Sequence, residues 1–321
     1  MSIRISCPYK NESKEKRIAD LFQSISEWIY SSDLLSLINL YDGNIPAGLS
    51  LKEYIGWLNN FTEIWDYRKK QADGGERWNI KESSFVDANQ NEIMRFIENL
   101  GLTNITEPEF TPNYILPLGG ARLTNLHRPM MARYVIDQYS LNNISVVALA
   151  GSRPIHEIEK PYVSQYAPNA DTEYDAICKG METAFGLSEN YEEDYIENNN
   201  VNLQSSMRKY KDRYKESCFY VSAAPSSDPA RRANSLDTFK YFLKRFSINS
   251  DDTILLTTSC IYVPFQLLKF MELAIETGAI VDCIGVNTSI SQSSLVKPIH
   301  YLQEIKSTIN AIYTLSNIYL N

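Results

Sequence analysis

The feature that most constrains the fold is an alternation of short apolar runs with helix-like segments in the C-terminal two thirds of the chain. The apolar runs cover residues 114–118, 145–150, 218–223, 253–257 and 279–286. Apolar residues at helical spacing fill the intervals, at 129–139, 171–185, 231–246 and 264–277. Strands that alternate with helices in this order predict an α/β domain with a doubly wound, mainly parallel sheet and right-handed crossovers.

The N-terminal third carries a different pattern, with apolar side chains at three- and four-residue spacing. This spacing predicts amphipathic helices, and Ser31 and Ser50 are placed to cap two of them. We therefore divide the chain into a helical N-terminal region, 1–110, and an α/β domain, 111–321. The segment 188–216 begins with acidic residues and ends in a mixed-charge, helix-like pattern. We expect it to form a surface excursion or flap of the α/β domain.

Four of the expected strands end in small, hydroxyl-bearing or basic residues. Ligands of open parallel sheets bind beyond the carboxyl ends of the strands, where free N–H groups, hydroxyls and helix N-termini favour an anion. Arginine adds a bidentate positive charge. We therefore predict an anion-binding cleft whose ligand contacts are Gly119, Gly120, Arg122, Arg128, Gly151, Ser152, Arg153, Thr258 and Ser259. The alternative is that Gly119 and Gly120 form an ordinary strand-to-helix turn beside surface arginines.

Acidic and aromatic residues near the same strand ends are candidates for orienting or deprotonating a substrate. Glu173 and Asp237 lie in the first turns of two expected helices, and Tyr262 follows the fourth strand. The helix dipole alone favours acidic residues in a first turn, so each carboxylate also has a structural explanation. His127 and His156 fall in strand-end loops, where they are either acid–base groups or solvated histidines.

Standard motifs and composition narrow the chemistry. The sequence contains no G-x-G-x-x-G after a strand, no Walker-type phosphate loop and no G-x-S-x-G nucleophile elbow. The three histidines lack metal-ligand spacing and the five cysteines form no Cys-x-x-Cys pair, so we expect no metal site and a reduced, cytoplasmic protein. The formal net charge of −8 and the absence of a long apolar segment argue against nucleic-acid and membrane partners. Assembly into a homo-oligomer stays open.

Five short segments, in this order along the chain, resemble the YdcF/SanA/ElyC-like family of Rossmann-like domains, whose function is largely unsettled. The segments are Leu118-Gly119-Gly120 followed by Arg128 or Arg133, Ala150-Gly151-Ser152-Arg153, Thr172-Glu173-x-x-Ala176 with Phe185-Gly186-Leu187, Ala233-Asn234-Ser235-x-x-Thr238, and Thr258-Ser259-x-x-Tyr262. Tyr262 stands where the family has a histidine, Ser152 replaces its second glycine and Ser235 replaces a threonine. The resemblance covers residues 113–286, implies a Rossmann-like sheet and adds Asn234 to the ligand contacts. It leaves the helical N-terminal region unexplained.

The resemblance also implies a ligand that is nucleotide-like or similar to S-adenosylmethionine, because members of the family have been linked to such binding. Together with the predicted cleft, it suggests an enzyme that acts on a small anionic metabolite by group transfer or hydrolysis, with the N-terminal helices covering or flanking the cleft. The alternative is a non-enzymatic ligand sensor or partner-binding protein with the same cleft, favoured by the missing histidine and the large helical block. A scaffold protein with a vestigial site would bind no ligand.

Overall fold

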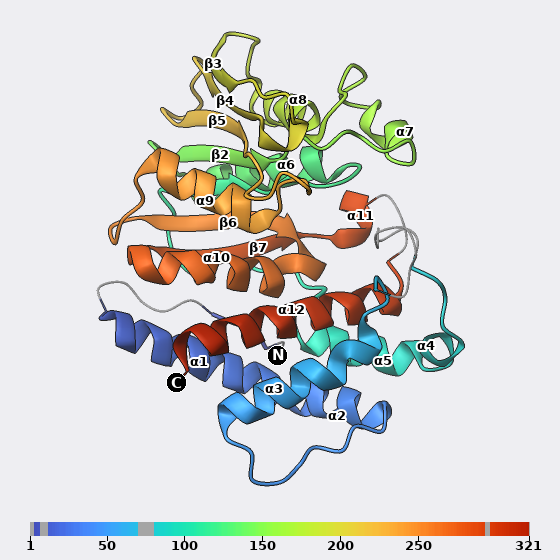
Figure 1. Cartoon of the computed structure of the whole chain (residues 1–321). Coiled ribbons are helices and arrows are strands. Elements are labelled where there is room, and N and C mark those ends of the chain that lie inside the picture. Colours follow the sequence, from blue (N-terminus) through green and yellow to red (C-terminus); the bar gives the residue numbers. More distant parts are fainter. Residues whose placement is uncertain (1–2, 7–11, 70–79, 293–295, 321) are drawn as a thin grey trace.

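A computed structural model describes residues 3–6, 12–69, 80–292 and 296–320 of the chain. Within these residues a seven-stranded sheet runs through the α/β part, in the order β3-β4-β5-β2-β1-β6-β7 (Figure 1). The strands are β1 (Tyr114–Pro117), β2 (Ser145–Ala150), β3 (Tyr191–Ile196), β4 (Ser205–Tyr210), β5 (Cys218–Ala223), β6 (Thr253–Ser259) and β7 (Ile280–Val286). The predicted α/β fold, with a mostly parallel sheet and a helical N-terminal region, is confirmed.

Five neighbouring strands of the sheet, β5, β2, β1, β6 and β7, are parallel. Tyr114 of β1 pairs with Ser145 of β2 on one side and with Ile254 of β6 on the other. The chain builds outward from β1 through β2 to β5, and then returns to add β6 and β7 beyond the other edge of β1. The strand order therefore reverses between β1 and β6, which is where open α/β sheets have their ligand crevice.

An antiparallel pair, β3 and β4, extends the sheet beyond β5. The expectation of a helix at the end of the 188–216 segment was wrong, because these residues form β4. Pairing with β5 and burial of Met207 and Tyr210 outweigh the helix-like spacing of charges. Tyr191 of β3 lies opposite Tyr210, with the ring centroids 5.8 Å apart, and the rest of β3 is exposed at the edge of the sheet.

Helices cover both faces of the sheet (Figure 1). α6 (Thr124–Gln138) and α8 (Glu173–Phe185) pack together on one face, and α9 (Ser235–Phe246) and α10 (Val263–Thr277) lie on the other. The short helices α7 (Lys160–Val163) and α11 (Thr288–Gln292) and the 3-10 turns η3 (Val201–Leu203) and η4 (Cys260–Tyr262) lie in the connections. The main helices match the four predicted segments, except that α6 begins earlier, at Thr124.

A close approach of α8 fixes the first turns of α6, next to the strand ends. Pro129 lies inside α6 and has no N–H, so the carbonyl of Asn125 lacks its helical donor. Gly180 of α8 packs directly against this carbonyl, where a Cβ would collide with it. Glycine at this position therefore lets the two helices cross closely and places the Asn125 side chain beneath the loop that follows β1.

The C-terminal helix α12 (Pro298–Tyr319) packs among the N-terminal helices and against α10 (Figure 1). Those elements are α1 (Lys14–Ile29), α2 (Ser32–Leu40), α3 (Leu51–Phe61), η1 (Thr62–Trp65), α4 (Ser84–Ala88) and α5 (Gln90–Asn99). Ser31 and Ser50 cap α2 and α3 as predicted. One hydrophobic core joins these helices, α12, α10 and one face of the sheet. The domain division at residue 110 stays a prediction, and it assigns α12 to the α/β part although the helix packs with both.

Candidate ligand-binding cleft

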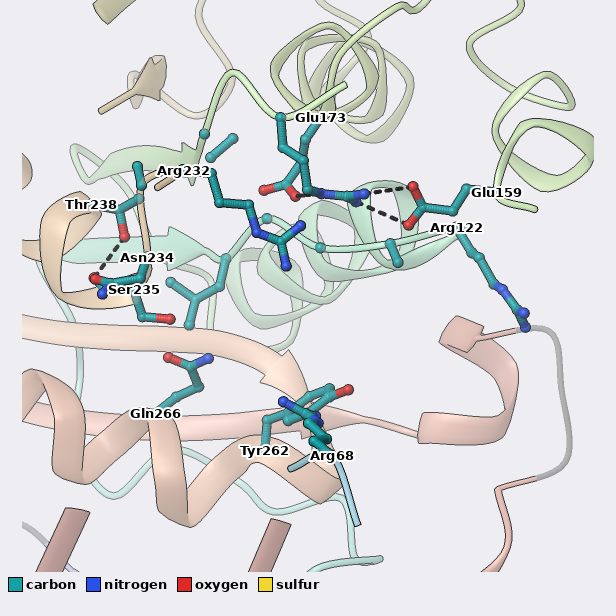
Figure 2. A pocket seen from close by; sticks show the side chains of 18 of the residues that line it. Arg68, Arg122, Glu159, Glu173, Arg232, Asn234, Ser235, Thr238, Tyr262 and Gln266 are labelled. Carbon is teal, nitrogen blue, oxygen red and sulfur yellow. Dashed lines mark hydrogen bonds and ion pairs between the residues drawn. The ribbon is translucent and has the colours of Figure 1, made fainter. Parts of the chain in front are cut away.

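A cleft of about 1100 Å³ opens beyond the carboxyl ends of β1 and β2 (Figure 2). One side is formed by the loops that follow these strands and by the starts of α8 and α9. The other side is formed by the first turns of α10 and α12 and by Arg68, Lys69, Ile80 and Glu82 of the N-terminal region. We call the first the sheet side and the second the helical side. The cleft thus joins segments more than two hundred residues apart in the sequence.

Basic side chains dominate the lining of the cleft. Among the described residues, eight arginines or lysines face three glutamates there: Arg68, Lys69, Arg122, Arg128, Arg153, Arg231, Arg232 and Lys297 against Glu82, Glu159 and Glu173. The lining therefore carries five more basic than acidic groups, in a chain whose formal net charge is −8. A local concentration of charge opposite in sign to that of the whole chain attracts anions to this place.

Gly119 and Gly120 line the cleft, but their N–H groups have partners inside the protein. The Gly119 N–H donates to the carbonyl of Leu149 at 2.6 Å, and the Gly120 N–H donates to Oδ1 of Asn125 at 2.9 Å. A Cβ on Gly119 would collide with Glu173 and lie 2.9 Å from the Leu149 oxygen, so packing requires glycine there. The expectation that these two N–H groups cradle an anion was wrong.

Arg122 follows the glycine pair in a conformation unusual for a residue with a side chain, with φ at 55°. Its carbonyl accepts a hydrogen bond from the Tyr166 hydroxyl at 3.0 Å, and its guanidinium lies 4.8 Å from the centre of the Tyr162 ring. Left-handed backbone at a residue other than glycine persists only where the surroundings hold it, and such residues gather at ligand sites. The segment around α7 therefore supports the loop that carries Arg122.

Arg128 bridges the ends of β1 and β6 at the strand-order reversal. From α6, its guanidinium donates to the carbonyls of Leu118 at 2.7 Å and Gly119 at 2.6 Å, and to Oγ of Ser259 at 3.2 Å. Arg128 is 3% exposed, and Thr258 and Ser259 are fully buried outside the lining of the cleft. The end of β6 carries these two hydroxyls into the packed interior, so their expected contact with a ligand finds no support in the lining of the cleft and stays a prediction.

Arg153 is held between two carboxylates, those of Glu159 and Glu173, which Figure 2 labels. Its terminal nitrogens donate to both oxygens of Glu159 at 2.7 and 3.0 Å, and its Nε donates to Glu173 at 3.2 Å. Glu159 is 1% exposed. Burial opposes the charged form of Arg153, but the hydrogen bond to Glu159 and the charge of Glu173 raise its pKa above the usual value. Two protein carboxylates therefore balance the charge that we had expected to neutralise a ligand.

Asp237 caps α9 and does not line the cleft. Its carboxylate accepts from Arg231 at 2.6 Å, from the Asn234 N–H at 3.0 Å and from the Ser227 N–H at 3.2 Å. The Asn234 side chain accepts from the Asp237 N–H in return, which completes a capping box. Burial alone would raise the pKa of Asp237, but the hydrogen bonds, led by that from Arg231, lower it to about 2. Its expected role in orienting or deprotonating a substrate stays a prediction, and here the carboxylate caps α9 outside the lining of the cleft.

The helical side of the cleft holds residues that the sequence analysis missed. Arg68 donates to the buried carboxylate of Glu304 in α12 at 2.5 Å, and Lys297 pairs with Glu82. His300 also lines the cleft. Its Nδ1 accepts the Lys297 N–H at 3.1 Å, which leaves Nε2 to carry the proton of a neutral ring. No local pattern marks these residues, because only tertiary packing brings them to the strand ends.

The cleft gathers nine of the thirteen predicted site residues: Gly119, Gly120, Arg122, Arg128, Gly151, Arg153, Glu173, Asn234 and Tyr262. Ser152, Thr258, Ser259 and Asp237 are not among the residues that line it. His127 and His156 do not line it either, and burial lowers the pKa of His127. Across the described ranges, no group of three or more His, Cys, Asp or Glu side chains is arranged to hold a metal ion.

Comparison with known proteins links the chain to uncharacterised relatives. Residues 12–101 match the family described as the Rv3785 N-terminal domain. The chain is 26% identical, over 95% of its length and 92% of theirs, to uncharacterized protein Rv3785 of Mycobacterium tuberculosis (strain ATCC 25618 / H37Rv) and uncharacterized protein Mb3814 of Mycobacterium bovis. No solved structure matches the chain significantly. These findings correct the resemblance to the YdcF/SanA/ElyC-like family: the matching family is a different one, and it includes the N-terminal helices that the resemblance left unexplained.

Proposed function

We propose that the cleft binds a phosphate-bearing, nucleotide-like small molecule. The observation that carries the proposal is the excess of basic side chains where the strand order of a parallel sheet reverses. The same strand order, with helices on both faces, supports a doubly wound, Rossmann-like sheet as the scaffold. A volume of about 1100 Å³ has room for a ligand of nucleotide size. Leu118, Leu149 and Phe239 offer apolar surface to its uncharged part.

The charge of the cleft ranks the two ligand types that the sequence suggested. S-adenosylmethionine carries a positive sulfonium and a positive amino group beside one carboxylate, whereas a nucleotide carries only negative groups at neutral pH. Five surplus basic side chains favour the nucleotide.

Group transfer or hydrolysis is the reaction that we assign to the cleft. Glu173 lies against Gly119 at the start of α8, and Tyr262 precedes α10 on the opposite side, so these two are the groups available to orient a substrate or move a proton. A ligand sensor is the second candidate. The observation that favours it is the ion pair of Glu173 with Arg153, which already engages this carboxylate within the protein.

The setting that we propose is the reduced cytoplasm. Cys178, Cys218, Cys260 and Cys283 are free thiols. In the described part of the chain, no helix has the length and apolar character needed to cross a membrane. Assembly into a homo-oligomer remains compatible with this proposal, and neither nucleic acid nor membrane enters it.

Isothermal titration with adenosine 5′-diphosphate, at low and high salt, tests the proposal. Arg232 lines the cleft from the loop before α9, and we expect Arg232→Ala to weaken binding by about tenfold or more, as the loss of a charge-assisted hydrogen bond does. Arg213→Ala is the matched control, because Arg213 is exposed and outside the cleft. The nucleotide site would be refuted if the wild type bound adenosine 5′-diphosphate more weakly than S-adenosylmethionine. It would also be refuted if Arg232→Ala and Arg213→Ala bound adenosine 5′-diphosphate with equal affinity.

Turnover separates the enzyme from the sensor. If the bound nucleotide is hydrolysed or transferred, Glu173→Gln should abolish turnover while the affinity changes little. Binding without turnover by the wild type, measured by phosphate release over hours, would favour the sensor.

A further inference from the structure

Gln266 has an unsatisfied side chain that faces the cleft. It lies in the first turn of α10, and Figure 2 shows its amide turned from that helix toward the cleft that it lines. In the described part of the protein, its Oε1 is buried and accepts no hydrogen bond. A buried acceptor without a partner destabilises a protein, so native structures provide one for nearly all such atoms. We take the donor that Gln266 lacks to be a group of the ligand in the cleft.

The charge around Gln266 differs from that on the sheet side. On the sheet side, five arginines stand with three carboxylates: Arg122, Arg128, Arg153, Arg231 and Arg232 with Glu159, Glu173 and Asp237. On the helical side, four basic residues stand with four carboxylates: Arg68, Lys69, Lys297 and Lys306 with Glu63, Asp66, Glu82 and Glu304. The positive excess therefore belongs to the sheet side, and the end of the cleft with Gln266 suits an uncharged group.

Among the residues that line the cleft together with Gln266, several are apolar or aromatic. Tyr262 lies one turn earlier in the chain, Phe239 comes from α9, and Val296 and Ile299 flank the start of α12. Apolar and aromatic walls around a single hydrogen-bond acceptor fit a flat ring that carries a donor at its edge. A sugar hydroxyl also donates, but a sugar would leave the apolar walls facing polar groups.

We propose that the Tyr262–Gln266 end of the cleft is a subsite for a nucleobase with an exocyclic amino group, which donates to Oε1 of Gln266. This inference rests on the proposed function and gives the ligand an orientation. The phosphates lie at the sheet side near Arg122 and Arg232, and the base lies at the helical side. Gln266 is then a specificity-determining residue.

A pair of nearly identical ligands tests the subsite. Adenosine 5′-monophosphate has the amino donor, and purine riboside 5′-monophosphate lacks only that group. Wild-type protein should bind the first about tenfold more tightly, which corresponds to one hydrogen bond to a buried acceptor. Gln266→Leu should bind both ligands equally, whereas Gln138→Leu, an exposed change at the far end of α6, should keep the preference. Cytidine 5′-monophosphate, ribose 5-phosphate and inorganic pyrophosphate complete the set.

The melting temperature of the unliganded protein provides a second readout that needs no ligand. Gln266→Leu removes the unsatisfied acceptor and should melt no lower than the wild type. A lower melting temperature would mean that the amide is already satisfied within the protein, which overturns the subsite.

The outcomes separate this inference from the proposed function. Preference for an amino-bearing nucleotide, lost only in Gln266→Leu, supports the subsite. Equal binding of the two purine nucleotides by the wild type, or binding of ribose 5-phosphate and pyrophosphate as tight as that of the nucleotides, overturns the subsite but leaves the phosphate site standing. Binding of none of these compounds overturns both.

Discussion

The two sides of the cleft use charged residues in opposite ways. On the sheet side, Arg128 and Arg153 are largely buried and donate to strand-end carbonyls or to carboxylates. On the helical side, Lys297 pairs with Glu82 and Lys69 with Glu63, and all four side chains are exposed. A buried guanidinium with several acceptors fixes the backbone around it, while an exposed pair contributes little and exchanges partners easily. The sheet side therefore sets the shape of the cleft. On the helical side Arg68 is fixed by the buried Glu304, and the two exposed pairs are free to adjust to a ligand.

Arg128→Ala should give the largest effect on stability. The substitution leaves the carbonyls of Leu118 and Gly119 and the hydroxyl of Ser259 without their donor, and it leaves a cavity between β1 and β6. We expect a loss of about 3 kcal/mol or more in the free energy of unfolding, measured by urea denaturation at neutral pH.

Arg128→Lys is the informative companion. An ammonium group is compact and cannot span two strands as the planar guanidinium does, so lysine should recover only a small part of the loss. If Arg128→Ala unfolds within about 0.5 kcal/mol of the wild type, as an ordinary surface substitution does, Arg128 does not hold the sheet side and the comparison between the two sides fails.

Asp237 makes the sheet side sensitive to acid. Its pKa is about 2 in the folded protein against an ordinary 3.8, so folding favours the ionised form. The resulting stabilisation, about 2 kcal/mol, is fully present above about pH 5 and is lost as the pH falls toward 2. Asp237→Asn should remove this contribution at pH 7 and flatten the decline of unfolding free energy between pH 5 and 2. Asp87→Asn, an exposed change in α4, should show the same decline between pH 5 and 2 as the wild type. If Asp237→Asn also shows the wild-type decline, Asp237 is not the source of the acid sensitivity.

The strand ends were predictable because their signals are local. Apolar runs followed by glycine or hydroxyl residues mark the carboxyl ends of β1, β2 and β6, and parallel strands bring these ends to one edge of the sheet. Hydrogen-bond partners were not predictable. The Asn125 side chain accepts a hydrogen bond from the Gly120 N–H, and Arg128 donates to the carbonyls of Leu118 and Gly119. Side chains two residues apart in a strand lie on the same face, so Thr257 and Ser259 of β6 both face Arg128 of α6. The sequence of β6 predicts that they share a face, but it does not predict which helix they meet.

The helical side was not predictable from the sequence for a different reason. Arg68 reaches the cleft because Glu304, 236 residues later, accepts its guanidinium. Periodicity within α12 indicates that Leu302 and Ile305 are buried, but it does not indicate which helix they meet. A contact between residues so far apart in the sequence is not indicated by residue spacing or composition. The residues of the helical side can therefore be identified only from the packed structure.

Removal of an ion pair on the helical side should give the smallest effect on stability. Lys297 and Glu82 pair in the lining of the cleft while both are exposed, and exposed pairs contribute about 0.2–1 kcal/mol. We expect Glu82→Gln to change the free energy of unfolding by less than about 0.5 kcal/mol, in contrast to Arg128→Ala. The same substitution removes a negative charge from the lining, so the affinity for adenosine 5′-diphosphate should rise, and the rise should shrink at high salt. A loss of stability in Glu82→Gln as large as that of Arg128→Ala would show that the helical side is as rigid as the sheet side. Such a loss occurs when one partner of a buried ion pair is removed, because the other charge is then left buried and uncompensated.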